Sequence, residues 1–195
     1  MYKYPLQLAF KLWTLAPKIS IANKEGNLVL FVRQKLFRLK EVIEVYRDDR
    51  LSEQLYTIKA DRIIDFSARY NFTDAKGATL GAVKRRGMRS LWKAHYEIYE
   101  QDRVVFNIQE ENPWIKVMDS LFSEIPVVGM FTGLVFNPTY IVSRPNGEIA
   151  ILLEKIPSFW SRLFTIKQLN RINDQEETQI LLSLLMMLLL ERNRG

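Results

Sequence analysis

The sequence predicts a mainly β protein: a closed antiparallel β-barrel of about 12 strands around a buried hydrophobic C-terminal helix, with one additional outer amphipathic helix. Three observations support this fold class. Short alternating apolar runs fill most of the chain, one turn-and-strand unit recurs three times, and the last helical segment is apolar on every side. Residues 1–195 are predicted to form a single domain, because a chain of this length can bury one sizeable core.

The strand prediction rests on period-two alternation between short turns. Segments such as KISIA, NLVLFVRQ, EVIEVY, LYTIKA, ARYNFTD, RVVFNI and TYIVSR follow this pattern rather than helical periodicity. They indicate about a dozen strands.

Three of the connecting turns share one chemistry. They read NKEG, DAKG and RPNG and end at Gly26, Gly77 and Gly147, which suits a type I turn with glycine in the left-handed position of a bulge. Each glycine is followed by a strand, a charged turn with a bulky pair and a second strand. The bulky pairs are Leu36-Phe37, Leu91-Trp92 and Phe159-Trp160. This repetition predicts a meander around a closed sheet.

A C-terminal helix over about residues 174–191 is predicted to fill the barrel. From Ile180 to Leu190 only Ser183 interrupts a block of Leu, Ile and Met. This run covers about 16 Å, which is too short to span a bilayer, and it lacks the polar face of an interfacial helix. Asn173 and Glu176 have the spacing of a capping box at its start. A membrane tail and a partner-binding helix are the alternatives, but a barrel of this size leaves a lumen about 10 Å wide, which suits a helix.

The outer helix is predicted in the segment ENPWIKVMDSLFSE, residues 111–124. Pro113 suits the first helical position, and apolar residues follow at the spacing of one helical stripe. We expect this helix to cover one mouth or side of the barrel, with a membrane-surface helix as the alternative.

Composition limits the class of protein and its location. The chain has no cysteine, which excludes disulfides, thiolate zinc sites and thiol nucleophiles. Its net charge of +6 favours anionic partners without the charge density of a dedicated nucleic-acid binder. Lys11 splits the apolar start of the chain, so a signal peptide is not expected. We therefore expect a cytoplasmic protein, peripheral to a membrane if it meets one, without a transmembrane span.

Several motifs in order resemble a known family. FVRQKLF, then GATLGAVKR followed by SLWKAHYEIY, then ENPW, NPTYIVSRPNG and the last apolar helix resemble the LURP-one-related proteins. Their superfamily also contains tubby C-terminal domains and phospholipid scramblases. The resemblance implies a 12-stranded barrel around a buried C-terminal helix and no established catalytic activity. Tubby domains bind phosphoinositides through basic side chains. Scramblases carry an acidic calcium-binding stretch near the last helix, but NDQEE here is explained by helix capping.

No catalytic constellation is visible in the sequence. His95 is the single histidine and lies in a strand pattern, so a structural role is predicted for it. Asp61 and Asp65 have basic neighbours and are predicted to be surface charges. No nucleophile elbow or phosphate-binding loop occurs. We expect a protein that is not an enzyme and that has neither cofactor nor metal.

The strongest functional signal is basic. Two segments at equivalent places of the repeat, KRRGMRSLWK and RQKLFRLKE, carry clustered cations. The candidate anion-binding residues are Lys84, Arg85, Arg86, Arg89, Lys93, Arg33 and Lys35. Arginine and lysine at one rim would suit an anionic phospholipid headgroup or another phosphorylated ligand. The predicted function is therefore a non-catalytic binding module, with a protein-interaction scaffold as the alternative. Solvated turns are the plain structural interpretation of these segments, and no nucleic-acid partner is expected.

Overall fold

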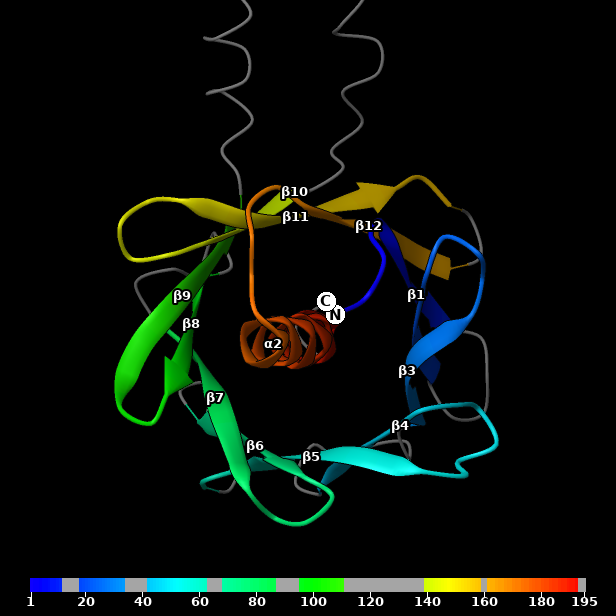
Figure 1. The fold of residues 1–195 in the computed structure, drawn as a ribbon, viewed down its shortest axis with the longest axis horizontal. Coiled ribbons are helices and arrows are strands. Elements are labelled where there is room, and N and C mark those ends of the chain that lie inside the picture. The colour runs from blue at the N-terminus through cyan, green and yellow to red at the C-terminus, as the bar shows by residue number, and fades with distance from the viewer. Residues whose placement is uncertain are drawn as a thin grey trace, which may run out of the picture.

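The computed structural model is a closed antiparallel barrel of 12 strands with a helix in its lumen (Figure 1). The structure describes residues 1–11, 18–33, 42–62, 68–86, 95–110, 139–158 and 161–192. The first six strands are β1 (Leu6–Lys11), β2 (Lys18–Ala22), β3 (Leu28–Arg33), β4 (Ile43–Tyr46), β5 (Gln54–Ala60) and β6 (Arg69–Asp74). The remaining elements are β7 (Thr79–Arg85), β8 (His95–Glu100), β9 (Arg103–Glu110), β10 (Thr139–Ser143), β11 (Ile149–Ile156), β12 (Ser161–Gln168) and α2 (Asp174–Arg192).

The strands form a simple meander. Each strand pairs with its neighbours in sequence, and β1 pairs with β12 to close the sheet. Closure leaves no free sheet edge, which removes the main route to edge-to-edge aggregation. The predicted barrel and its strand number are confirmed.

The three predicted glycine turns connect strands at one end of this meander. Gly26, Gly77 and Gly147 have φ angles of +83°, +86° and +90°, in the left-handed region. In the first turn the Gly26 amide donates to the Asn23 carbonyl at 3.0 Å. The strand register shifts beside each turn, as a bulge requires.

Helix α2 is buried along its apolar block. Every residue from Ile180 to Leu190 is at most 9% exposed. Ser183 is satisfied locally, because its hydroxyl donates to the Gln179 carbonyl at 2.7 Å. Burying each leucine contributes about 1.5–3 kcal/mol, so this helix adds substantially to the stability of the core. The predicted helix over about 174–191 is confirmed to within one residue.

The predicted capping box also forms. The Glu176 amide donates to Asn173 Oδ1 at 2.9 Å, and the Asn173 amide donates to Glu176 Oε2 at 2.9 Å. These two bonds satisfy backbone donors that the first helical turn leaves without partners.

The helix lies closer to one side of the wall than to the other. It approaches β7 most closely, followed by β8 and β6. Gly81 on β7 permits this approach, because a Cβ atom there would lie only 3.0 Å from Nε2 and 3.3 Å from Cγ of Gln179 on the helix. The same Cβ would also lie 2.6 Å from the Tyr99 carbonyl oxygen on the neighbouring strand β8. Gln179 Nε2 instead donates to the Leu80 carbonyl at 2.6 Å and fixes the helix against β7.

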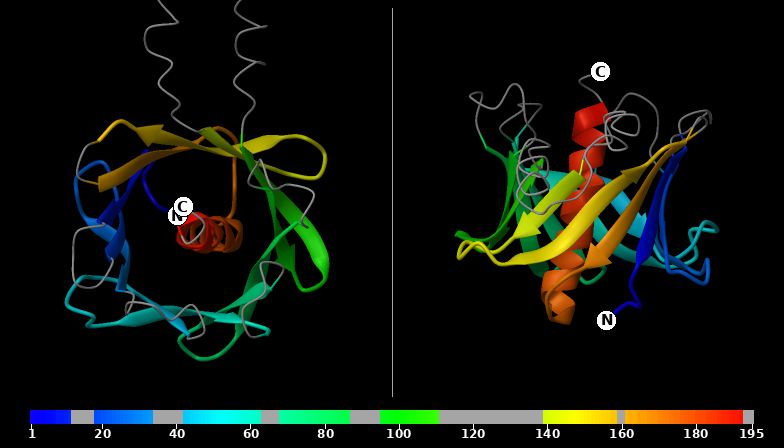
Figure 2. Two further views of the ribbon diagram at one scale, coloured as in Figure 1. Left: turned by 180° about the vertical axis from the view of Figure 1, so that it is seen from behind. Right: turned by 90° about the horizontal axis from the view of Figure 1, so that it is seen from above.

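The barrel has two different ends, which Figure 2 shows in its right-hand view. We call the end with the three glycine turns and the start of α2 the turn end. The opposite end, where β1, β3, β7 and β11 finish and α2 stops at Arg192, is called the cavity end. The outer helix predicted over residues 111–124 lies outside the described residues, among which α2 is the only helix.

Candidate functional site

The predicted cations do not form one cluster within the described part of the chain. Arg89, Lys93 and Lys35 lie outside it. Arg33 ends β3, whereas Lys84, Arg85 and Arg86 lie at the end of β7, four strands away around the wall. At the usual strand spacing this separation is about 19 Å, too far for one phosphate group to bridge.

Arg85 points into the lumen and not outward with its neighbours. Its side chain is 8% exposed, and its Nη2 lies 3.8 Å from Glu191 Oε1 near the end of α2. Its guanidinium also lies 5.9 Å from the centre of the Tyr96 ring. Arg85 was predicted to be one of the anion-binding cations at the rim. Strand alternation instead places it on the same face as the buried Val83.

Tyr96 completes this buried group. Its hydroxyl donates to Glu191 Oε1 at 2.5 Å. Burial, followed by this hydrogen bond to a carboxylate, raises the pKa of Tyr96 well above its ordinary value. The group joins the end of α2 to β7 and β8, so Arg85 has a structural role.

Lys84 and Arg86 lie on the outer face of the wall beside acidic and aromatic partners. Arg86 Nε lies 3.6 Å from Glu97 Oε1, and Lys84 is directly opposite Glu97 in the β7–β8 register. The Tyr99 hydroxyl donates to Glu97 at 2.6 Å, and burial with this bond raises the pKa of Tyr99 to about 12. The segment KRRGMRSLWK contains no acid, but the neighbouring strand supplies one.

A second group of cations lies at the cavity end of β1, β2 and β3. Lys11 is directly opposite Lys18, and Lys18 is directly opposite Arg33. The side chains of Lys18 and Arg33 are exposed and form no ion pair within the described residues. Like charges directly opposite each other on a sheet are unfavourable. We call Lys18 and Arg33 the outer basic row.

A cavity of about 130 Å³ lies inside the barrel at the cavity end. It is on the side of the lumen away from β7, where the displaced helix leaves space. Its lining residues are Phe10, Tyr140, Lys155, Arg162, Phe164, Leu188 and Glu191. The wall is therefore mostly aromatic and aliphatic, with two cations on β11 and β12.

The charges around the cavity are not evenly paired. Glu191 is bonded to Tyr96 and Arg85, as described above. The side chains of Lys155 and Arg162 form no hydrogen bond or ion pair within the described residues. Burial, followed by the charge of Glu110, raises the pKa of Tyr140 to about 12, so this hydroxyl is neutral at physiological pH. The cavity thus combines an apolar wall with excess positive charge.

The sequence predictions missed Lys155 and Arg162, although a signal for both exists. In AILLEKI and SRLFTI, strand alternation puts Lys155 on the face of Leu153 and Arg162 on the face of Phe164, and both apolar residues are buried in the core. A cation on the apolar face of a strand is the feature that distinguishes them from solvated lysines and arginines.

Other polar residues do not assemble a second site. Within the described residues, no three His, Cys, Asp or Glu side chains gather as a metal site would need. His95 is half-buried on β8, and its Nε2 has no hydrogen-bond partner there, so its structural role stays a prediction. Asp61 accepts a hydrogen bond from the Arg69 amide at 3.0 Å, and Asp65 lies outside the described residues. No helix in the described ranges has both the length and the apolar character to cross a bilayer.

The fold defines the class of protein as a 12-stranded antiparallel barrel with a buried helix through its lumen. The family model of the LURP-one-related proteins matches residues 28–180, and the chain belongs to this family. Comparisons with curated proteins and with solved structures found no significant match. The family resemblance inferred from the sequence motifs is therefore confirmed.

Proposed function

We propose that this protein is a non-catalytic binding module that recognises an anionic phospholipid headgroup, or a similar phosphorylated ligand, at the cavity end of its barrel. The observation that supports this proposal is the outer basic row. Lys18 and Arg33 are exposed cations held directly opposite each other, with Lys11 in the next register position.

The electrostatics of the outer basic row favour a polyvalent anion. Adjacent strands hold these cations at fixed spacing, so their mutual repulsion cannot be relieved by moving the backbone. A phosphate group reduces that repulsion and accepts charge-assisted hydrogen bonds, which contribute about 1.5–3 kcal/mol each when partly desolvated. In this proposal the protein acts in the cytoplasm, peripheral to the membrane, and uses neither a cofactor nor a metal.

Lys84 and Arg86 are the weaker candidates for this role. Glu97 already balances part of their charge. The Arg85 side chain is committed to Glu191 in the lumen. The outer basic row is therefore the stronger candidate for the anion-binding site.

Vesicle sedimentation at about 0.15 M salt tests the proposal, because the Debye length of about 8 Å leaves only close contacts effective. Wild-type protein should sediment with phosphatidylcholine vesicles that contain a phosphoinositide and not with phosphatidylcholine alone. The double variant Lys18→Glu/Arg33→Glu should lose this binding. Lys84→Glu/Arg86→Glu should retain most of it.

The matched control is Lys24→Glu/Lys76→Glu. These two lysines are exposed at the turn end, and the variant lowers the net charge by the same amount. It should bind like the wild type. Equal losses in the test and control variants would indicate attraction by net charge alone. If the wild type ignores both vesicle types, the protein-interaction scaffold becomes the better proposal.

A further inference from the structure

The cavity is open at its mouth, where Arg162 is exposed and Lys155 is half-buried, and it combines these cations with a buried apolar wall. Its wall is formed by Phe10, Phe164 and Leu188, of which none is more than 8% exposed. Tyr140 closes another part of the wall and is 9% exposed. Lys155 and Arg162 add the only cations of the lining.

The two cations lie on neighbouring strands and face the same space. Lys155 is directly opposite Phe164 in the β11–β12 register, and Arg162 lies two residues before Phe164 on the same face. Arg162 is also directly opposite Phe10 on β1. Diagonal neighbours of this kind lie about 7–8 Å apart at Cα, a separation that two long side chains easily bridge around one anion.

Balancing the helix dipole is the alternative role for these cations. The C-terminal end of α2 carries partial negative charge, which nearby cations stabilise. However, Arg85 on β7 already lies 3.8 Å from Glu191 in the last turn of the helix. Lys155 and Arg162 line the cavity together with the Glu191 carboxylate, but no carboxylate of the described residues lies within ion-pair distance of either cation.

We propose that this cavity binds a small amphiphilic carboxylate, with its apolar group against Phe10, Phe164 and Leu188 and its carboxylate between Lys155 and Arg162. The size supports one compact apolar group, since an apolar cavity of about 150 Å³ accommodates benzene. Arginine binds a planar carboxylate through two parallel hydrogen bonds, and lysine adds a point charge. Hydrogen-bond donation by Tyr140 is available as well, because its hydroxyl stays protonated.

This site is separate from the outer basic row. Lys18 and Arg33 alternate with buried residues and face outward, whereas Lys155 and Arg162 share the face of the buried core residues. Either proposal can therefore fail without the other.

Isothermal titration calorimetry with three probes tests the site on the wild-type protein. Benzoate, benzyl alcohol and benzylamine have a similar apolar ring and differ in charge. Benzoate should bind about 10- to 100-fold more tightly than either of the others, as expected for a charge-assisted contact in place of a neutral or repulsive one. Equal affinity for benzoate and benzyl alcohol, or absence of benzoate binding, would overturn the proposal.

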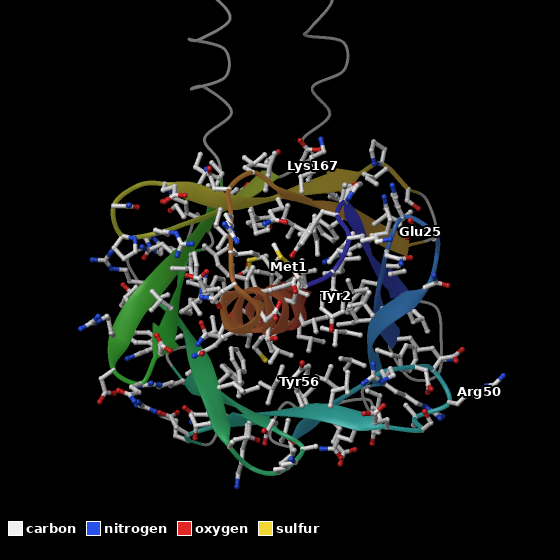
Figure 3. All side chains as sticks on the ribbon, in the orientation of Figure 1. Met1, Tyr2, Glu25, Arg50, Tyr56 and Lys167 are labelled. Carbon is white, nitrogen blue, oxygen red and sulfur yellow. The ribbon has the colours of Figure 1, made fainter. Side chains whose placement is uncertain are left out.

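Substitutions on β11 and β12 then locate the binding site. Lys155→Gln and Arg162→Gln should each weaken benzoate binding at least about tenfold. Lys167→Gln is the matched control, because Lys167 lies on the same strand as Arg162, faces outward (Figure 3) and pairs with Glu154 at 2.6 Å. It should leave the affinity unchanged. An equal loss in Lys167→Gln would show that benzoate senses only the overall charge, and the cavity would then not be its site.

Discussion

The two ends of the lumen differ in how completely their polar side chains are paired. At the turn end, Glu176 binds Arg144, Glu177 accepts two hydrogen bonds from the Tyr2 amide at 3.0 and 3.1 Å, and Gln179 binds the Leu80 carbonyl. At the cavity end, Lys155 and Arg162 surround a space of about 130 Å³ without partners among the described residues. Among the described residues, the polar side chains at the turn end are therefore paired more completely than the two cations at the cavity end.

The turn end shows what a fully paired charged cluster looks like in this fold. Arg144 also lies 4.9 Å from the centre of the Phe106 ring, and its hydrogen bond to Glu176 lowers the pKa of that carboxyl. Glu177 is 2% exposed, and the amide of Tyr2 together with the Met1 ammonium group at 3.6 Å offsets its loss of hydration. Figure 3 shows Met1 and Tyr2 beside the helix at this end, with Tyr56 reaching in from β5. Natural folds normally leave few buried polar groups without such partners.

The largest effect is expected from a charge placed in the middle of α2, the helix that runs from the turn end to the cavity end. Leu185 is 1% exposed, so Leu185→Asp places a carboxylate in the apolar lumen. We expect a loss of more than about 4 kcal/mol in the free energy of unfolding, which is a large part of the roughly 5–15 kcal/mol that is typical of a domain. Urea denaturation followed by circular dichroism measures this loss.

The control for this variant is the same substitution on the surface. Leu169 is 52% exposed, and Leu169→Asp should change the unfolding free energy by no more than about 0.5 kcal/mol. A Leu185→Asp protein that unfolds at the wild-type urea concentration would disprove the buried position of α2.

A smaller effect is expected where the helix approaches β7. Gly81→Ala places a Cβ 2.6 Å from the Tyr99 carbonyl oxygen, at a φ of +147°. We expect a loss of about 2–4 kcal/mol from backbone strain and overpacking together. Gly147→Ala is the control, because its φ is +90° but no atom lies within 4 Å of the added Cβ. It should lose only about 1 kcal/mol, measured by thermal unfolding. Equal losses would mean that Tyr99 and Gln179 do not crowd Gly81 as described.

The features that follow from local sequence were predicted correctly. Period-two alternation and the recurring glycine turns determine which segments pair, and the meander then follows from short connections. The capping box formed because Asn173 and Glu176 are three residues apart, which is a local relation. Burial of α2 was predictable because its apolar block has no polar face and is too short to span a bilayer.

The candidate site was harder to predict than the fold, because it depends on contacts between strands that are distant in the sequence. Glu97 meets Arg86 only through the β7–β8 register, and Lys18 meets Arg33 only through the β2–β3 register. The cavity depends further on which side of the wall the helix approaches. Gly81 leaves room for Gln179 of the helix on that side, and one glycine in a strand pattern does not reveal what will pack against it.

The smallest expected effect compares a side chain that stabilises the turn end with the two cations proposed to bind a ligand at the cavity end. Asn173→Ala removes the acceptor for the Glu176 amide at the turn end and should cost about 1 kcal/mol of unfolding free energy. Lys155→Gln and Arg162→Gln at the cavity end should each change it by no more than about 0.5 kcal/mol in ligand-free protein, since neither side chain has a described partner to lose. Urea denaturation of all three variants at one salt concentration gives the comparison. Losses of about 1 kcal/mol in Lys155→Gln and Arg162→Gln would instead indicate that these cations stabilise the end of α2, as Arg85 does, because a helix dipole contributes up to that amount per cation.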